Sequence, residues 1–333
     1  MRVVVLGATG NVGTSVCEAL GAEPEVTDIV GVARRLPELT LPKVTWAAAD
    51  ISIDPLDDLL AGADAVVHLA WLIQPSHDER GMWKVNVGGT ERVLDAVARA
   101  GVRTVVYASS IGVYAPGPKD RRVDESWPTT GVGSSQYSRH KVEAERAFDQ
   151  FEREYPDRRV VRMRKALNFK SGAAAGIERL FLGPFAPTLL LGRYGLPVVP
   201  NDPRFTTQAV HTSDVADAYR RALVSDVEGP VNLAAEPVLT PAVMAKVLGA
   251  RPVSLPSTLL KIGAFASHRL RVQPVEPGWI DLATSAPLMD TTRARDELGW
   301  DPRISADDAL GELLRGFATD DGMPTPQLHP TPH

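Results

Sequence analysis

A tyrosine and a lysine four residues apart, Tyr137 and Lys141, form the pair best suited to acid–base chemistry. On a helix this spacing places both side chains on one face, about one turn apart. The face continues as Ala144, Phe148 and Phe151, an apolar stripe that would dock the helix on a core and hold its reactive end rigid. Because an ammonium group favours a neighbouring phenolate, we expect Lys141 to lower the pKa of Tyr137. Such a phenol could protonate a developing alkoxide or deprotonate an alcohol.

Because Tyr-x3-Lys also occurs by chance on surface helices, the spacing alone does not predict a catalytic pair, and other residues must support it. One of these is Ser110, which follows the apolar strand predicted at residues 105–109. Ligands bind at the carboxyl ends of parallel strands, so the Ser110 hydroxyl could polarise a carbonyl oxygen that Tyr137 also reaches. Alone, this serine could equally be a helix cap or a turn residue. With Tyr137 and Lys141 downstream, the three residues predict a catalytic set.

Near the N-terminus, three glycines separate an apolar strand at residues 3–6 from a helix pattern that starts at Val12. Glycines at this junction let the backbone approach a pyrophosphate, and the helix N-terminus offers free N–H groups and the positive end of its dipole. The strand, loop and helix together predict a dinucleotide site rather than a simple turn. Its expected contacts are Gly7, Thr9, Gly10, Asn11, Val12 and Gly13.

The end of the second strand indicates which dinucleotide binds. Folds that prefer NAD place a carboxylate about 20 residues past the glycines, on the ribose hydroxyls. This position is Ala33, followed by Arg34 and Arg35, whose guanidinium groups could hold a 2′-phosphate. We therefore expect NADP in preference to NAD, although the arginines could instead be a solvated strand end. Asp50 and Ile51, at the end of the third strand, could contact the adenine, or Asp50 could cap a turn.

Strand and helix patterns alternate along the chain, which predicts an α/β fold. Several strands are apolar on both faces, as in a parallel sheet covered by helices. The predicted strands lie at residues 3–6, 29–32, 44–49, 65–70, 105–109, 160–163 and 231–234. The predicted helices lie at residues 12–20, 54–61 and 82–100, from 137, from about 177, from a cap at Ser213, from a cap at Thr240 to a stop at Gly249, and at 306–317.

Composition restricts the function classes. The chain has 333 residues, of which 44% are hydrophobic and 23% charged, as in a globular protein with a large core. A net charge of -5 gives no reason to expect binding to nucleic acid or to an anionic membrane. No apolar run reaches the roughly 18 residues of a membrane span, and the N-terminus lacks a signal-peptide layout. The single Cys17 fits a reducing cytoplasm and a packed core position. The seven histidines form no metal pattern, and His68 is more typical of a core residue.

Taken together, these motifs resemble the extended short-chain dehydrogenase/reductase family, usually labelled NAD-dependent epimerase/dehydratase, from Val3 to about Phe317. The resemblance implies a Rossmann fold, a doubly wound parallel sheet of about seven strands, with a small C-terminal substrate-binding lobe. It implies Tyr137 as acid/base, Lys141 as the holder of the nicotinamide ribose, and Ser110 as the residue that orients the substrate oxygen. The matching landmarks are residues 7–13, 50–51, 68–70, 86–90, 110–114, 137–141, 210–216 and 298–302.

The resemblance also extends the expected contacts and domains. It implies that the Rossmann domain spans residues 1–168, with 205–235 returning to it, and that 169–204 and 236–317 form the substrate-binding lobe. Residues 318–333, with four prolines, would be a disordered tail. Family members commonly dimerise through the helices at 82–100 and 137–151, which leaves a homodimer open. The further cofactor contacts are Leu69, Ala70, Trp71, Asn86, Ala108 and Ala166, besides Tyr137 and Lys141. The substrate contacts are Trp71, Ser110, Tyr114 and Leu167, although Trp71 could equally belong to the core.

Departures from the family pattern narrow the substrate. Dehydratases carry an Asp-Glu pair after the catalytic hydroxyl residue, whereas Ile111 and Gly112 stand here. No acid is therefore placed to expel water, which argues against a dehydratase. Nucleotide-sugar enzymes tend to have Arg-Pro-Gly-Asn on the sixth strand, but here the run is Arg164-Lys165-Ala166-Leu167. Leu167 cannot form the hydrogen bond of that asparagine, and no role follows for Lys165.

The sequence thus predicts an NADP(H)-dependent oxidoreductase. It would move a hydride between the nicotinamide and a carbonyl or secondary alcohol of a small, fairly apolar molecule. One alternative is a nucleotide-sugar epimerase with tightly bound NAD(P), which uses the same three residues. Another is an NADP-sensing protein without turnover, against which the retention of Tyr137 and Lys141 argues.

Overall fold

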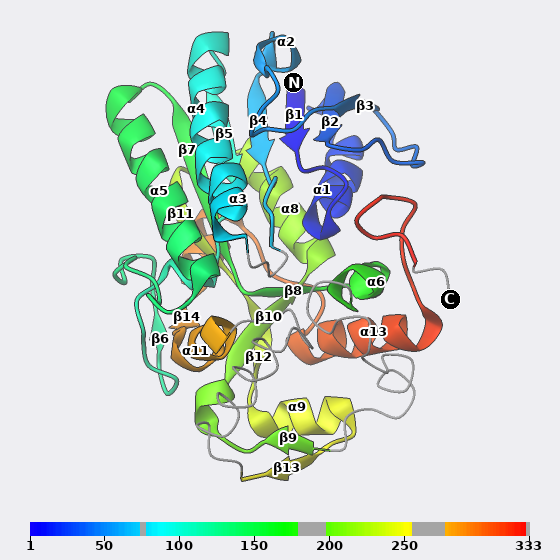
Figure 1. Ribbon diagram of the computed structural model, residues 1–333, viewed down its shortest axis with the longest axis vertical. Coiled ribbons are helices and arrows are strands. Elements are labelled where there is room, and N and C mark those ends of the chain that lie inside the picture. The colour runs from blue at the N-terminus through cyan, green and yellow to red at the C-terminus, as the bar shows by residue number, and fades with distance from the viewer. Residues whose placement is uncertain (74–77, 179–197, 255–276, 331–333) are drawn as a thin grey trace.

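The computed structural model describes residues 1–73, 78–178, 198–254 and 277–330. Within these ranges, the central element is a parallel sheet of seven strands in the order β11-β7-β5-β4-β1-β2-β3 (Figure 1). All seven coincide with predicted strands, so the predicted Rossmann-type sheet is confirmed. The strands are β1 (Arg2–Leu6), β2 (Asp28–Ala33), β3 (Val44–Ala48), β4 (Ala65–His68), β5 (Thr104–Tyr107), β7 (Arg159–Lys165) and β11 (Gly229–Leu233). The principal helices beside it are α1 (Asn11–Gly21), α4 (Gly89–Ala100), α5 (Gln136–Glu154) and α8 (Thr212–Leu223).

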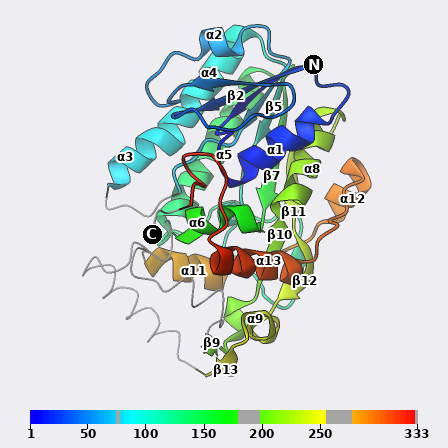
Figure 2. The ribbon, with the colours of Figure 1, turned by 90° about the vertical axis from the view of Figure 1, so that its right-hand side faces the viewer.

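Side chains of the central strands alternate between two hydrophobic cores, one on each face of the sheet. On β1, Val3 and Val5 enter the core to which α1 and α8 contribute, and Cys17 of α1 is buried there as expected. Val4 and Leu6 enter the opposite core, with side chains from α4 and α5. The two helix pairs lie on either side of the sheet (Figures 1 and 2). Because both faces are covered, residues 3–6 of β1 are apolar and buried at every position.

The helix predicted over residues 82–100 is interrupted. α3 (Glu79–Trp83) leads into a π-helical turn, η1 (Lys84–Gly88), and only then does α4 begin. Asn86 lies buried in this turn, where its side chain accepts a hydrogen bond from the Leu72 N–H (2.7 Å) and donates one to the Leu72 carbonyl (2.9 Å). The π turn therefore presents Asn86 to the segment that follows β4.

Of two predicted helix caps, the structure confirms one and contradicts the other. Thr240 caps the next helix as predicted, accepting from the Val243 N–H, and Gly249 ends that helix in a left-handed conformation. At α8 the predicted cap, Ser213, is wrong. The helix begins at Thr212, and His211 is the cap, because its ring nitrogen accepts from the Ser213 N–H.

Smaller sheets, which the strand patterns do not predict, lie beyond the central one. Their strands have two to five residues, too few for a clear periodic pattern. They pair as β12-β10-β8, β13-β9 and β14-β6, with β6 (Arg122–Val123), β8 (Leu167–Phe169), β9 (Val198–Pro200), β10 (Thr207–His211), β12 (Ala235–Leu239), β13 (Arg251–Val253) and β14 (Leu288–Met289). The remaining helices of the described ranges are α2 (Asp57–Leu60), η2 (Ile111–Val113), η3 (Ser171–Ala173), α6 (Ala174–Ile177), η5 (Pro203–Phe205), α9 (Pro241–Leu248), α11 (Pro277–Ser285), α12 (Thr292–Leu298) and α13 (Ala306–Thr319). The helix predicted from about residue 177 falls largely outside the described residues.

The expectation of a disordered tail is wrong for residues 321–330. After α13 this segment folds back toward α1 (Figure 2). Thr325 and Leu328 are buried within it, and its backbone is hydrogen-bonded to residues far away in the chain. Proline content indicated disorder, but specific contacts with the glycine loop order the segment. None of the helices in the described ranges is long and apolar enough to span a membrane.

Candidate functional site

The start of α5 fixes the position of the predicted acid–base pair. Ser135 caps the helix by accepting from the Ser138 N–H, so Tyr137 lies in the first turn and Lys141 one turn later. Ser138 donates to the Gly112 carbonyl (2.5 Å) and accepts from the Val132 N–H (2.7 Å). This serine joins the helix to the loop that carries Ser110, a role with no signal in the sequence beyond its place beside Tyr137.

Tyr137 and Ser110 are brought together at the carboxyl end of the sheet. Ser110 lies close enough to the phenol to lower its pKa. The Ser110 oxygen also accepts from the Gly112 N–H at 3.1 Å, so the serine caps η2 as well. The phenol ring packs between two indoles, edge-on to Trp71 at 6.2 Å and tilted against Trp279 at 5.0 Å between ring centroids. Ser110 is therefore a cap of η2, and its catalytic role stays a prediction.

Lys141 is buried beneath this pair. Its Nζ donates to the Ala108 carbonyl at 2.7 Å and to the Tyr107 hydroxyl at 3.3 Å. The same nitrogen lies 3.4 Å from the centroid of the Trp71 ring and 6.0 Å from that of Tyr137. Burial, together with the charge of Lys165, lowers the pKa of Lys141 well below its ordinary value.

The expected effect of Lys141 on the phenol is wrong for this structure. Burial raises the pKa of Tyr137 to about 12, and the neighbouring Ser110 side chain offsets only part of that rise. Lys141 contributes no lowering because its amine is directed to the Ala108 carbonyl and its own charged form is disfavoured by burial. Tyr137 is therefore a neutral phenol over the physiological pH range.

Lys165, which had no assigned role, lies at the end of β7 beside this site. It pairs with Ser110 across the strand ends, and its Nζ donates to the Ser109 carbonyl at 2.9 Å. Burial lowers the pKa of Lys165 to about 8. Lys165 is thus a second buried amine at this site, next to Ser109 and Ser110, and its charge disfavours the charged form of Lys141.

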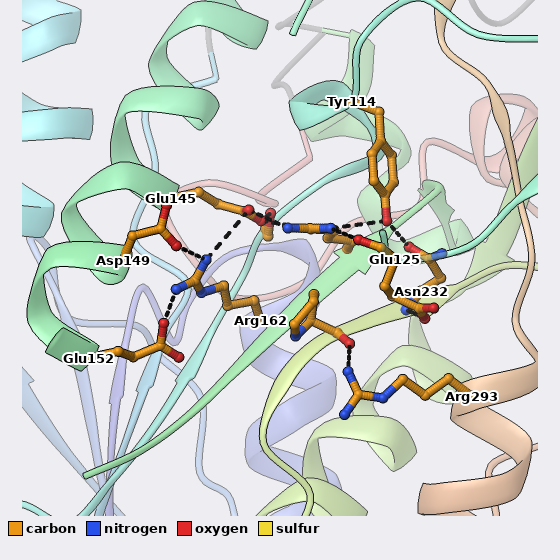
Figure 3. Close-up of polar contacts among 11 residues, drawn as sticks. Tyr114, Glu125, Glu145, Asp149, Glu152, Arg162, Asn232 and Arg293 are labelled. Atoms are coloured by element: carbon orange, nitrogen blue, oxygen red, sulfur yellow. Dashed lines mark hydrogen bonds and ion pairs between the residues drawn. The ribbon is translucent and has the colours of Figure 1, made fainter. Parts of the chain in front are cut away.

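A buried ionic network supports the site from below (Figure 3). Glu145, one turn beyond Lys141 on α5, accepts from two nitrogens of Arg164 at 3.0 and 2.6 Å, and from the Ser109 hydroxyl. Burial alone would raise the pKa of Glu145, but the hydrogen bonds and charges of the arginines hold it below its ordinary value. Arg162, on the same strand as Arg164, continues the network to Asp149 and Glu152.

The same network accounts for Tyr114, which was expected to contact substrate. Its ring is fully buried, and its hydroxyl donates to the Asn232 side chain at 2.6 Å and accepts from Arg164 at 3.2 Å. The structure therefore places Tyr114 in the protein interior, contrary to the expectation. The physical reason is Arg164, a buried cation that requires acceptors on every side. Leu167, another expected substrate contact and the first residue of β8, is 44% exposed.

The glycine loop lies at the other end of the site. Gly7 has a φ of +84°, and a Cβ there would lie 2.6 Å from the Ala70 nitrogen. At Gly13 a Cβ would lie 2.3 Å from the Gly7 carbonyl oxygen, so this glycine serves close helix–loop packing. The N-terminus of α1 has neither a side-chain cap nor an acidic residue in its first turn. Its N–H groups thus remain suited to an anion such as a pyrophosphate.

A cavity opens at this loop. It lies at the carboxyl ends of β1, β2, β3 and β4, where the fold places ligands. Of the expected cofactor contacts, nine line it: Gly7, Thr9, Gly10, Arg34, Asp50, Ile51, Leu69, Ala70 and Trp71. The lining residues that the sequence reasoning did not assign as contacts are Val32, Ala33, Ala49, Leu72, Val85 and Gln327.

The other expected cofactor contacts lie around this cavity rather than in its lining. Asn11 donates to the Asn168 carbonyl, and Val12 packs on the core. Asn86 holds the backbone of Leu72, which does line the cavity, and so acts on the cavity through that backbone. Ala108 and Ala166 are buried at the ends of β5 and β7, where Ala108 supplies the carbonyl that holds Lys141.

The two arginines after β2 contact different parts of the molecule. Arg34 lines the cavity, whereas Arg35 donates to the Pro326 carbonyl at 3.4 Å. Asp50 also faces the cavity, but one carboxylate oxygen accepts from both the N–H and the hydroxyl of Ser52, so it caps a turn as well. Burial opposes ionisation of Asp50, yet these hydrogen bonds and the charge of Arg34 hold its pKa below the ordinary value.

His68, the end residue of β4, is a core residue as predicted. It is fully buried, its Nε2 is 3.0 Å from the Thr90 hydroxyl, and burial lowers its pKa to about 3.

Comparison with known proteins gives a family match and several distant relatives. The family model described as "NAD dependent epimerase/dehydratase family" matches residues 3–234. An uncharacterized protein of Mycobacterium tuberculosis is 28% identical over 317 residues, which are 94% of this chain and 30% of that protein. The chain therefore spans less than a third of the length of the first curated relatives it matches. L-arabinose 1-dehydrogenase (NAD(P)(+)) of Haloferax volcanii is 35% identical over 113 residues, 34% of this chain and 42% of that enzyme.

Solved structures share the fold over nearly the whole chain. UDP-glucose 4-epimerase of Thermotoga maritima gives a TM-score of 0.73 at 18% identity, covering 96% of this chain and 99% of that one. UDP-glucuronic acid 4-epimerase of Bacillus cereus, solved in complex with NAD, gives a TM-score of 0.71 at 18% identity, with the same coverage. At this level of identity the likeness establishes the fold alone.

Proposed function

The chain belongs to the NAD-dependent epimerase/dehydratase family, and we propose that it is an NADP(H)-dependent oxidoreductase. It would act on a carbonyl or secondary alcohol of a small, fairly apolar molecule. The observation that carries the proposal is that Tyr137 and Ser110 lie together beside Gly112, at the end of the same sheet whose glycine loop forms the cavity.

The cavity fits a nicotinamide dinucleotide. The uncapped N-terminus of α1 suits the pyrophosphate, and Ile51 and Asp50 line the end of the cavity that would receive the adenine. Ala33 occupies the position of a ribose-binding carboxylate, and Arg34 lies next to it in the lining. A guanidinium group at this place favours the 2′-phosphate of NADP. The family resemblance would bring Lys141 and Tyr137 to the nicotinamide ribose.

Residues of the chain itself would donate or accept the proton. When bound, the nicotinamide would supply or accept the hydride. Because burial raises the pKa of Tyr137 to about 12, the phenol carries its proton near neutrality and suits the role of proton donor to a carbonyl oxygen during reduction. Ser110, beside the same phenol, would hold that oxygen. In the oxidation direction the phenol would first have to lose its proton, which favours reduction at neutral pH.

Several features support a small apolar substrate. Leu167, where nucleotide-sugar members tend to have an asparagine, is 44% exposed and has no polar atom to offer. Trp279 and Trp71 enclose the phenol with apolar surface. The partial match to a dehydrogenase named for NAD(P)+ supports net redox chemistry over epimerisation.

The first test is a titration of NADPH and NADH on the wild type, Arg34→Ala and the control Arg146→Ala. Arg146 is an exposed arginine of α5. We expect tighter NADPH binding, and at least about tenfold weaker NADPH binding in Arg34→Ala with NADH unchanged, because a charge-assisted contact of 1.5–3 kcal/mol is lost. Equal binding of both dinucleotides by the wild type would refute the NADP preference.

The second test separates the reductase from the epimerase. A panel of small carbonyl compounds should show net NADPH consumption that Tyr137→Phe abolishes. Turnover of a UDP-sugar without net consumption, by protein that retains its dinucleotide through purification, would support the epimerase instead.

A further inference from the structure

Residues 321–330, called here the C-terminal strap, connect the far helix α13 to the nucleotide-binding end of the sheet. The Asp321 N–H donates to the Gly316 carbonyl at the end of α13, and the Ala175 N–H of α6 donates to the Asp321 carbonyl. Further along, the Glu38 N–H, in the segment after β2, donates to the Pro324 carbonyl at 3.0 Å. Figure 1 shows the strap, in red, lying beside α1.

The strap contacts the glycine loop through side chains. Thr325 is 1% exposed, and its hydroxyl donates to the Thr9 carbonyl at 3.0 Å. In the opposite direction, the Thr9 hydroxyl donates to the Gln327 side-chain oxygen at 2.8 Å. Gln327 itself lines the cavity together with Gly7 and Gly10. The strap therefore adds a polar side chain to the wall of the cavity that the proposed function assigns to the dinucleotide.

The strap is already ordered in the structure. The Met323 N–H donates to the Leu328 carbonyl and the Leu328 N–H to the Thr325 carbonyl, which closes the turn that presents Gln327. Leu328 is buried against α6, where a Cβ on Gly176 would lie 3.0 Å from its side chain. Three prolines, Pro324, Pro326 and Pro330, restrict the backbone further. A preformed wall has little conformational entropy to lose when a ligand binds.

The strap also holds the residue next to the predicted phosphate contact. Arg35 donates to the Pro326 carbonyl at 3.4 Å, while its neighbour Arg34 lines the cavity. The end of β2, which distinguishes NADP from NAD in this fold, is thus in contact with the strap.

We infer that the C-terminal strap is part of the dinucleotide site, with Gln327 contacting the phosphate-bearing part of the cofactor. Thr325 is a positioning residue that holds Thr9 and the glycine loop. The inference rests on the proposed dinucleotide binding, and it extends the site beyond residue 234, where the family match ends.

The experiment is a calorimetric titration of NADPH on the wild type, Gln327→Ala, Gln327→Glu, Thr325→Val and Thr325→Ser. Gln150→Ala and Thr45→Val are the controls, because Gln150 and Thr45 are exposed and neither lines the cavity. Loss of one hydrogen bond predicts about 3- to 10-fold weaker binding for Gln327→Ala and Thr325→Val. Gln327→Glu should bind more weakly still, since a carboxylate repels phosphate. Thr325→Ser, which keeps the hydroxyl, should restore wild-type affinity, which a loss of packing alone would not explain.

The outcomes separate the inference from the proposed function. If the wild type binds neither NADPH nor NADH, both fail. If the wild type binds and the strap variants match their controls, only the inference fails. Tighter binding in Gln327→Ala would mean that the strap obstructs the cavity, which also overturns the inference. Should a variant fail to fold, amide hydrogen exchange of the wild type decides: NADPH should slow exchange in residues 321–330, and unchanged exchange there refutes the contact.

Discussion

The Nζ nitrogen of Lys141 lies 3.4 Å from the centroid of the Trp71 indole ring, and Trp71 also lines the cavity. Because burial disfavours the charged form of Lys141, this contact contributes no more than the roughly 0.5–2 kcal/mol of a full cation–π contact. Hydroxyl groups of a bound ribose could replace an interaction of that size. Trp71 is therefore the side chain whose surroundings should change most when a dinucleotide binds.

Tryptophan fluorescence tests this directly. We predict that Trp71→Phe removes at least half of the emission change that NADPH causes in the wild type. Trp83→Phe is the matched control, because Trp83 is 42% exposed and packs on His140, outside the cavity lining. A full emission change in Trp71→Phe would show that the indole does not respond to the cofactor.

Tyr137→Phe should lower kcat for carbonyl reduction by about 10²- to 10⁴-fold while weakening NADPH binding no more than about tenfold, because the proton donor is lost but at most one hydrogen bond to the cofactor. Tyr155→Phe, at the far end of α5, is the control and should retain activity. Steady-state kinetics and NADPH titration together measure the two effects. Equal loss of affinity and turnover would instead indicate that the phenol serves cofactor binding.

The pH dependence follows from the pKa of Tyr137, which burial raises to about 12. Below that value the phenol keeps its proton, so reduction should show no loss of rate from this group between about pH 6 and 9. Oxidation of the corresponding alcohol needs the phenolate and should accelerate as pH rises over the same range. A reduction rate that falls with a midpoint near pH 7, and loses that midpoint in Tyr137→Phe, would mean that the bound state lowers the phenol pKa strongly.

Glu145→Gln should destabilise the protein by about 3–5 kcal/mol, because it leaves the buried cation of Arg164 without its counter-charge. Asp149→Asn is the control: its side chain is 47% exposed, so loss of its ion pair with Arg162 should cost less than about 1 kcal/mol. Urea unfolding at neutral pH measures both. Similar small losses in the free energy of unfolding for the two variants would show that solvent or a rearrangement of side chains compensates the charge of Arg164.

His68 predicts a stability that depends on pH. Burial lowers its pKa from 6.5 to about 3, so between these values the unfolded chain binds a proton that the folded chain does not. Stability therefore falls as pH falls through this window, by up to about 1.4 kcal/mol per pH unit. Between pH 7 and 5, urea unfolding should show a smaller fall in the free energy of unfolding for His68→Asn than for the wild type. His329→Asn, at an exposed position, should follow the wild type. Equal slopes for His68→Asn and wild type would remove His68 as the cause.

Local patterns in the sequence were sufficient to predict the strands of the sheet and the face of α5 that carries Tyr137 and Lys141. The seven central strands and the helical spacing of Tyr137 and Lys141 depend on apolar periodicity over a few residues, which any segment carries by itself. The glycine loop was equally local, since a strand, three glycines and a helix follow one another directly. For the same reason the positions of Ser110, Arg34 and the cavity edge at Asp50 could be inferred.

Tertiary structure alone decided the electrostatics and the distant partners. The phenol pKa depends on burial between Trp71 and Trp279, and the interior placement of Tyr114 depends on Arg164 and Asn232, none of which is near in sequence. Gln327 meets Thr9 across 318 residues, where composition indicated a disordered tail. Sequence patterns report which face of a segment is buried, but pKa values and long-range hydrogen bonds depend on which other segments cover that face.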